Sequence, residues 1–153
     1  MDRADRALIE ALQSDSSLSI AQLAERVNLS ASACHRRMRA LEERGGIAGY
    51  AARIDPRKLG LAVEVFVVIT LIGQSRERME QFEQAVATFD DILECDLMSG
   101  TGDYLLRIAA TDLDHYGVIH RDCLARLPGV SDMRTSFSLR RIKRFAGYRV
   151  PSA

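Results

Sequence analysis

Residues 18–41 show helical hydrophobic periodicity in two short stretches, with a break at residues 28 and 29. In each stretch the apolar residues recur every three or four positions, which places them on one face of an α-helix. Ser19 and Ser30 precede the two stretches, and a serine oxygen there can accept a hydrogen bond from an unpaired backbone N–H group. This pattern predicts a helix-turn-helix. The apolar positions are Ile20, Leu23, Ala24 and Val27 in the first helix, and Cys34, Met38 and Leu41 in the second.

The second of these helices has a basic outer face. Residues 30–41 contain three arginines and no acidic residue. An outward arginine can bind the edge of a guanine or neutralise a phosphate. A solvated basic helix face is the alternative, and Arg37, which falls nearer the buried side, is expected to pair with a nearby acid or to pack its stem. The residues that we predict to contact double-stranded DNA are Ser30, Ser32, His35, Arg36 and Arg39.

The segments that flank these helices complete an N-terminal domain. Residues 2–13 form an amphipathic helix, with Asp2 where a helix N-terminus favours a negative charge. Gly45 and Gly46 end the third helix, because glycine accepts the left-handed conformation of a helix C-cap. Residues 47–55 are expected to form a short strand pair, or wing. We therefore predict a winged helix-turn-helix over residues 1–50 and a linker strand over residues 51–62.

From residue 63 the periodicity changes from helical to strand-like. Residues 63–72 are rich in β-branched residues and apolar on both faces, so both faces of this strand should be covered, one of them by a second subunit. The order of elements is βαββαβ, which predicts an α+β fold in which a ferredoxin-like domain spans residues 63–153. The expected strands are 63–72, 92–99, 104–111 and 130–144, and the expected helices are 76–89 and 112–127.

Composition narrows the class of protein. The chain has 21 basic and 21 acidic residues and a net charge of zero. The local arginine cluster is therefore a better indication of DNA binding than the total charge. No apolar run is long enough for a membrane span, and the charged N-terminus does not resemble a signal peptide, which predicts a cytoplasmic protein. Cys34, Cys95 and Cys123 are too far apart in sequence for a zinc motif and are expected to be buried thiols.

Residues 99–104, with the sequence SGTGDY, offer the partners that a zwitterion needs. Gly100 and Gly102 allow close backbone approach and expose N–H groups that suit a carboxylate. Asp103 could pair with an ammonium group. The alternative is an ordinary hairpin turn, where glycine and aspartate are expected in any case, and on the residues alone that alternative is favoured.

Across nearly its whole length the chain resembles the Lrp/AsnC (feast/famine) transcriptional regulators. The resemblance depends on the order and spacing of segments: MDRADRALIEAL, LAERVNLSASACHRRMRALEERG, IAGYAARIDPRKLG, VFVVITL, ECDLMSGTGDYLL and LARLPGVSDMRTSFSL. Two positions depart from the family pattern, Asn28 in the turn and Gly46 after the third helix. Asparagine tolerates the left-handed conformation, so the turn should survive, whereas Gly46 should loosen the wing.

The resemblance implies a small-molecule effector, expected to be an amino acid, which binds between effector domains. It also implies a homodimer formed through the second domain, which commonly assembles to an octamer. The effector identity, the operator, the sign of regulation and the assembly number are not contained in the sequence. The effector residues that the resemblance implies are Gly100, Thr101, Gly102, Asp103 and Tyr104 in the loop, and Phe137 and Ser138 on the last strand.

Two other functional classes remain open. Sirohaem decarboxylases resemble this family in fold but need haem-facing histidines, and His115 and His120 lie about 140° apart on one helix. An architectural DNA-binding protein would bind without sequence preference or effector. The sequence contains no catalytic constellation. We therefore predict a regulator that is not an enzyme and that has no cofactor and no metal.

Overall fold

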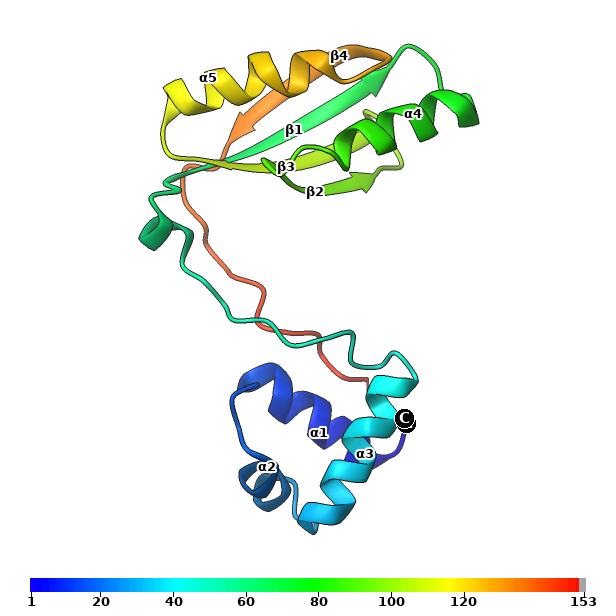
Figure 1. Ribbon diagram of the computed structural model, residues 1–153, viewed down its shortest axis with the longest axis vertical. Helices are drawn as coiled ribbons and strands as arrows, with labels where there is room; N and C mark the ends of the chain where they lie inside the picture. The colour runs from blue at the N-terminus through cyan, green and yellow to red at the C-terminus, as the bar shows by residue number, and fades with distance from the viewer. Residues whose placement is uncertain (152–153) are drawn as a thin grey trace. The chain divides into compact units, whose positions relative to one another are not determined.

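The computed structural model describes residues 1–151 and divides into two compact units. Residues 1–53 form the first unit together with residues 142–151, and residues 54–141 form the second (Figure 1). The sequence-based division placed the whole of residues 63–153 in the second domain. The structure differs there, because the last described residues contact the first unit.

The first unit contains three helices, α1 (Arg3–Ser14), α2 (Ile20–Arg26) and α3 (Ala31–Glu43). Ser19 and Ser30 cap α2 and α3 as predicted, each accepting a hydrogen bond from a backbone N–H group of the first turn. Asn28 adopts a φ of 55° in the turn between them, which confirms that the turn forms with asparagine in the left-handed conformation. The buried core is Leu8, Ala11, Leu12, Leu23, Ala24, Cys34 and Leu41.

The expected wing is the main difference in this unit. The structure contains no strand within residues 47–55, which are extended but pair with no neighbouring strand. Gly46 N donates a 2.8 Å hydrogen bond to the Leu41 carbonyl, and Ile47 packs against the helical core. Gly46 and Ile47 are therefore held against the end of α3. Residues 47–55 contain too few β-branched residues to specify a strand pair by themselves.

The second unit is an α+β sandwich with the predicted βαββαβ order. A short 3₁₀ helix, η1 (Pro56–Leu59), precedes the first strand. The sheet order is β2-β3-β1-β4 and every pairing is antiparallel. The elements are β1 (Val63–Leu71), α4 (Arg76–Val86), β2 (Ile92–Leu97), β3 (Tyr104–Ala110), α5 (Leu113–Asp122), a second 3₁₀ helix η2 (Leu124–Arg126) and β4 (Val130–Phe137).

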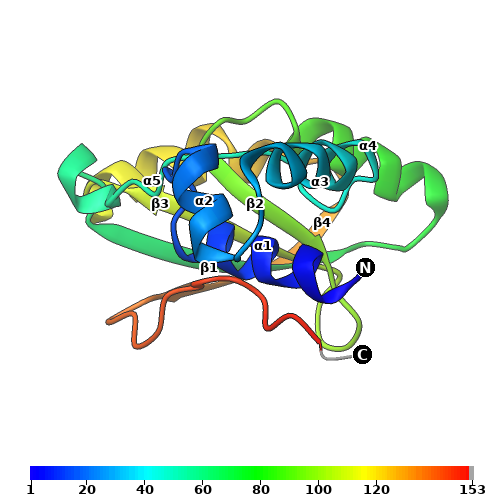
Figure 2. The same cartoon turned by 90° about the horizontal axis from the view of Figure 1, so that it is seen from below.

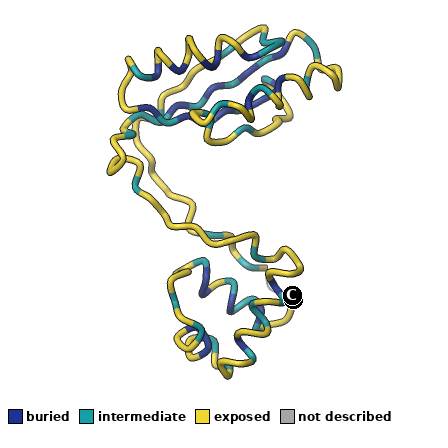
Figure 3. Tube along the Cα trace, in the orientation of Figure 1, coloured by how far each residue is buried: buried dark blue, intermediate teal, exposed yellow. Residues whose placement is uncertain are grey.

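Both helices of this unit cover the same face of the sheet (Figures 1 and 2). Along β1 and β3 burial alternates, because successive side chains point to opposite faces (Figure 3). The covered face contributes most of the core, and Phe82 of α4 and Ile119 of α5 are packed onto it. The other face carries Phe66, Val68 and Leu105, which are only partly buried within one chain. The helices and β4 are several residues shorter than expected.

Candidate DNA-binding face and effector loop

The outer face of α3 is exposed as predicted. Ser32, His35, Arg36 and Arg39 are all exposed, while Cys34 and Leu41 of the same helix are buried. Ser30 accepts a 3.2 Å hydrogen bond from Ala33 N and lies 3.2 Å from the Ser32 hydroxyl. The helix therefore presents two hydroxyl groups at its start and cationic side chains along one side, which suits both phosphate and base contacts.

Arg37 is the arginine of α3 that does not belong to this face. Its Nη1 atom lies 2.6 Å from an Asp2 oxygen and 2.7 Å from an Asp5 oxygen, which confirms that it pairs with nearby acids. The hydrogen bond from the Asp5 backbone N–H, and then Arg37, lower the pKa of Asp2. Within residues 1–151, Arg36 and Arg39 form no ion pair. These two arginines are therefore available to an external anion.

A cavity of about 380 Å³ between α1 and α3 brings in one residue that the sequence analysis missed. Arg44, the C-cap residue of α3, lines this cavity together with Arg36 and Arg37. Arg44 follows Arg37 by seven residues, which on a helix returns to within about 20° of the same side. That spacing would have been the signal in the sequence. The cavity has a cationic lining on the α3 side and the paired carboxylates on the α1 side.

The loop between β2 and β3 exposes its backbone at Gly100 and Thr101. Among the described residues, the N–H groups of Gly100, Thr101 and Gly102 have no acceptor. Gly102 has a φ of 89°, and a β-carbon there would lie 2.3 Å from Cγ1 of Val68. Only glycine fits this approach to β1, and the consequence is a row of N–H groups at the surface, which is suitable for an anion.

Asp103 is buried, with 7% of its surface exposed, and its carboxylate already has two hydrogen bonds. One oxygen accepts from Leu71 N at 2.7 Å, and the other accepts from Gln74 Nε2 at 2.5 Å. The Asp103 backbone also donates a 2.7 Å hydrogen bond to the Ile69 carbonyl. Asp103 therefore fixes the loop to the end of β1. A carboxylate has about four acceptor sites, so these two hydrogen bonds leave two of them unused.

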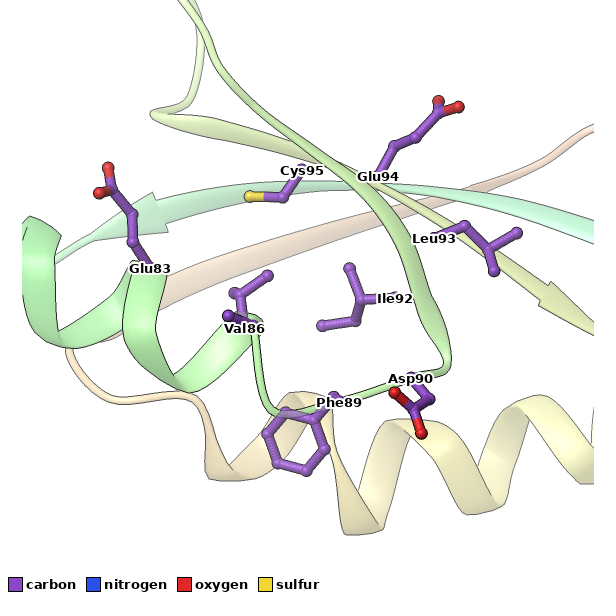
Figure 4. A pocket seen from close by; sticks show the side chains of 9 residues that line it. Glu83, Val86, Phe89, Asp90, Ile92, Leu93, Glu94 and Cys95 are labelled. Carbon is purple, nitrogen blue, oxygen red and sulfur yellow. The ribbon is translucent and has the colours of Figure 1, made fainter. Parts of the chain in front are cut away.

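Tyr104 connects the loop to a cavity of about 540 Å³ between α4 and β2. Its hydroxyl donates a 2.7 Å hydrogen bond to Glu83, and burial followed by this carboxylate raises the pKa of Tyr104. Figure 4 shows Val86 and Ile92 facing each other across this cavity, with Cys95 and Glu83 at its edge. Burial, and then the charges of Asp96 and Glu83, raise the pKa of Cys95 to about 11. The sequence analysis did not identify this cavity.

Phe137 and Ser138 do not meet the loop within one chain. Phe137 pairs with Val65 on one side of β1, whereas Tyr104 pairs with Ile69 on the other. Four residues of strand separate these positions, or about 13 Å along β1. Phe137 instead contacts Tyr116, with ring centroids 5.3 Å apart, and Ser138 N donates to the Glu64 carbonyl at 2.9 Å. One small ligand cannot touch both groups of a single chain.

Residues 1–151 contain no cluster of three His, Cys, Asp or Glu side chains that could hold a metal ion. Cys34, Cys95 and Cys123 are free thiols, two of them buried. No helix in this part of the chain is long and apolar enough to cross a membrane.

Comparisons with known proteins agree with this arrangement. Residues 1–47 match a winged helix-turn-helix DNA-binding family, and residues 64–147 match the Lrp/AsnC ligand binding domain. The leucine-responsive regulatory proteins of Klebsiella pneumoniae and Escherichia coli are each 41% identical to this chain over 143 residues, covering 94% of the chain and 87% of the relative.

Solved structures show the same similarity. A transcriptional regulator from Neisseria meningitidis, crystallised as a complex with L-Met, superposes with a TM-score of 0.92 at 31% identity, covering 97% of this chain and 96% of its own. An AsnC family regulator from Agrobacterium tumefaciens gives a TM-score of 0.90 at 36% identity, covering 99% and 97% of the two chains.

Proposed function

Because the chain belongs to the Lrp/AsnC family of DNA-binding transcriptional regulators, we propose that it binds its operator through the outer face of α3 and that an amino acid bound at the loop of residues 99–104 controls this binding. The observation that carries the proposal is the difference in ion pairing among the arginines on α3. Arg37 is neutralised by two aspartates, whereas Arg36 and Arg39 are exposed without an acidic partner in residues 1–151.

The DNA contacts follow from the position of each side chain on α3. Arg36 and Arg39 would read guanine edges in the major groove or bind phosphates. Ser32 and His35, on the same exposed side, would contact neighbouring bases, and Ser30 would contact a phosphate at the start of the helix. Arg44, which lines a cavity with Arg36 and Arg37, would add a cation beside this face rather than on it.

The effector proposal rests on the backbone of the loop. The exposed N–H groups at Gly100 and Thr101 would bind the carboxylate of an amino acid. Asp103 would orient the loop and use its remaining acceptor sites for the ammonium group, with Gly102 and Tyr104 holding the loop against the sheet. The similar Neisseria meningitidis regulator in complex with L-Met supports an amino acid as the class of effector.

The site would be shared between subunits. Phe137 and Ser138 are about 13 Å from the loop along β1 of the same chain. A ligand that contacts both groups must therefore take the loop from one chain and the last strand from another. A ligand bound in this way stabilises whichever assembly brings the two chains together, in proportion to its preference for that assembly.

Dimerisation would cover the open face of the sheet. Phe66, Val68 and Leu105 are only partly buried there, and neither α4 nor α5 packs on this face. Charged residues surround them, including Arg107, whose Nε atom is buried without a hydrogen-bond partner. A second copy of the chain can cover such a face. The dimers would assemble further, to an octamer.

The test begins with the full chain and sheared genomic DNA in the presence of competitor. We expect enrichment of specific fragments, whose affinity is then measured with each common amino acid at millimolar concentration. At least one amino acid should change operator affinity, and by linkage the operator should change the affinity for that amino acid by the same factor. No enriched fragment would overturn the operator proposal, and no responding amino acid would overturn the effector proposal.

Two variants of Asp103 separate orienting the loop from binding the ligand. Asparagine can keep both hydrogen bonds if its carbonyl accepts from Leu71 N and its NH2 group donates to Gln74 Oε1, which requires the Gln74 amide to turn over, but it lacks the charge. Asp103→Asn should therefore keep the fold and lose effector affinity in calorimetry, while effector-free DNA binding stays unchanged. Asp103→Ala should also destabilise the loop. Unchanged effector binding in Asp103→Asn would show that the carboxylate does not bind the ammonium group.

A further inference from the structure

The C-terminal segment of residues 140–150 is basic throughout. It contains Arg140, Arg141, Lys143, Arg144 and Arg149, and the last acidic residue of the chain is Asp132. Arg141 is paired with Glu64. Among the described residues, no acid pairs with Arg140, Lys143 or Arg149. Three cations in one short segment without a counter-charge among the described residues are characteristic of a segment that binds a polyanion.

Most of this segment belongs to the DNA-binding unit, although it follows the last strand of the ligand-binding domain; Arg140 and Arg141 still belong to the second unit. From residue 142 onward it groups with α1, α2 and α3. Gln13, near the end of α1, holds it with both ends of its side-chain amide. Nε2 donates to the Tyr148 carbonyl at 3.0 Å, and Oε1 accepts from Tyr148 N at 2.5 Å.

Two neighbouring residues, Gly147 and Arg53, contribute to the contact between Gln13 and Tyr148. Gly147 has a φ of 121°, and a β-carbon there would lie 2.8–3.0 Å from atoms of Gln13. Arg53 donates a 3.2 Å hydrogen bond to the Gln13 carbonyl and so adds a further cation at the same place. By contrast, Ile142, Phe145 and Tyr148 are mostly exposed. The segment is therefore held mainly by hydrogen bonds to α1, with its charged side chains in solvent.

We propose that residues 142–150, with the adjoining Arg140, form a basic arm that is docked on α1 by Gln13 and binds the phosphate backbone of DNA beside the site contacted by α3. The inference rests on the DNA-binding function proposed above. A phosphate contact releases condensed counterions but carries no base information, so the arm should strengthen binding to operator and non-operator DNA alike. Contact between two copies of this arm is disfavoured, because their like charges repel each other.

The test removes three charges that have no acidic partner within residues 1–151, in the variant Arg140→Gln, Lys143→Gln, Arg149→Gln. Each lost phosphate contact lowers the slope of log affinity against log salt by about 0.9. Over a fourfold rise in salt, the wild type should therefore lose roughly 40-fold more affinity than the triple variant if all three cations contact phosphates. The loss of affinity at low salt should be equal on operator and random DNA, so their ratio is kept.

Three controls make the result specific. Arg76→Gln, Arg121→Gln, Arg126→Gln removes the same charge from exposed positions of the second unit and should leave the salt slope unchanged. Arg140→Lys, Lys143→Arg, Arg149→Lys keeps the charge and should keep the slope. Gln13→Ala keeps all the cations but releases the arm, so it should weaken binding to both DNAs by less than the triple variant.

The outcomes are distinguishable. If the wild type binds no DNA, the proposed function fails before the arm is tested. If the triple variant and the wild type have the same salt slope and the same affinity for random DNA, the arm does not bind DNA. If the triple variant instead changes the mass of the assembly in light scattering while the salt slope is kept, the segment is a subunit contact, which also overturns the proposal.

Discussion

The outer face of α3 and the loop of residues 99–104 are both candidate binding sites, but they are built differently. The DNA-binding face is the exposed side of one helix, and its residues follow from helical spacing alone. The loop depends on hydrogen bonds to β1 and to Gln74, and on the contact of Gly102 with Val68. A face of one helix can be predicted from local sequence, whereas a loop that several segments position cannot.

The two sites also differ in whether a single chain brings all of their residues together. Ser32, His35, Arg36 and Arg39 are presented together by a single chain. The loop residues and Phe137 are at different ends of β1. The DNA-binding face should therefore respond to substitutions one residue at a time, while the effector site should respond to anything that changes the loop or the assembly.

The largest effect is expected for DNA binding in the variant Arg36→Ala, Arg39→Ala. Each arginine that contacts a base should contribute about 1–3 kcal/mol of operator binding free energy. Because both side chains are exposed and form no ion pair within residues 1–151, circular dichroism and the melting temperature should not change. Fluorescence anisotropy with a labelled operator measures the affinity. A folded double variant with wild-type affinity would contradict the assignment of this face.

The next effect is on folding, at Gly102. Gly102→Ala puts a β-carbon against Val68 at a φ of 89°, so overpacking and backbone strain should together cost about 2–4 kcal/mol of unfolding free energy. Adding Val68→Ala should recover part of this loss, because it removes the clashing Cγ1 atom. Gly100→Ala, which meets no atom within 4 Å, should show the backbone strain without the clash. Urea unfolding of the three variants would measure the difference.

A smaller effect is expected at Arg37, which resembles Arg36 in sequence but not in its contacts. Arg37→Ala should lower the melting temperature and leave operator affinity close to wild type. The pKa of Asp2 is lowered in the folded protein, so its contribution to stability is present above its usual value of 3.8 and is lost as the pH falls through the lowered pKa. The variant should therefore show a weaker loss of stability between pH 5 and pH 2 than the wild type. A steeper loss in the variant would contradict this pairing.

The smallest effect is on thiol reactivity. With a pKa of about 11, Cys95 should contain about a hundredfold less thiolate at pH 8 than a thiol at the reference value of 9.0. Cys34 is fully buried on the inner side of α3. Alkylation by iodoacetamide, followed by mass spectrometry, should therefore be slow at both sites until the protein unfolds. Rapid labelling of Cys95 in the folded protein would show that the cavity between α4 and β2 is more open than the structure indicates.

Much of the fold could be predicted because its signals are local. Ser19 and Ser30 mark the starts of α2 and α3, and the change from helical to alternating periodicity marks the second unit. The strand pair expected within residues 47–55 was wrong, because this segment has few β-branched residues and local sequence cannot identify a partner strand for it. The pairing of Arg37 was predicted from its angle on the helix, but its partners, Asp2 and Asp5, are more than thirty positions away.

The sequence by itself determined the order of helices and strands along the chain and the exposed arginines, because side-chain period and capping depend on neighbours within a few positions. Features that depend on contacts between distant segments appeared only in the tertiary structure. It buried Asp103 against β1, separated Phe137 from the loop, and docked Tyr148 on Gln13, 135 positions away. Such contacts depend on shape and hydrogen-bond geometry after the chain has folded, and no periodicity in the sequence encodes them.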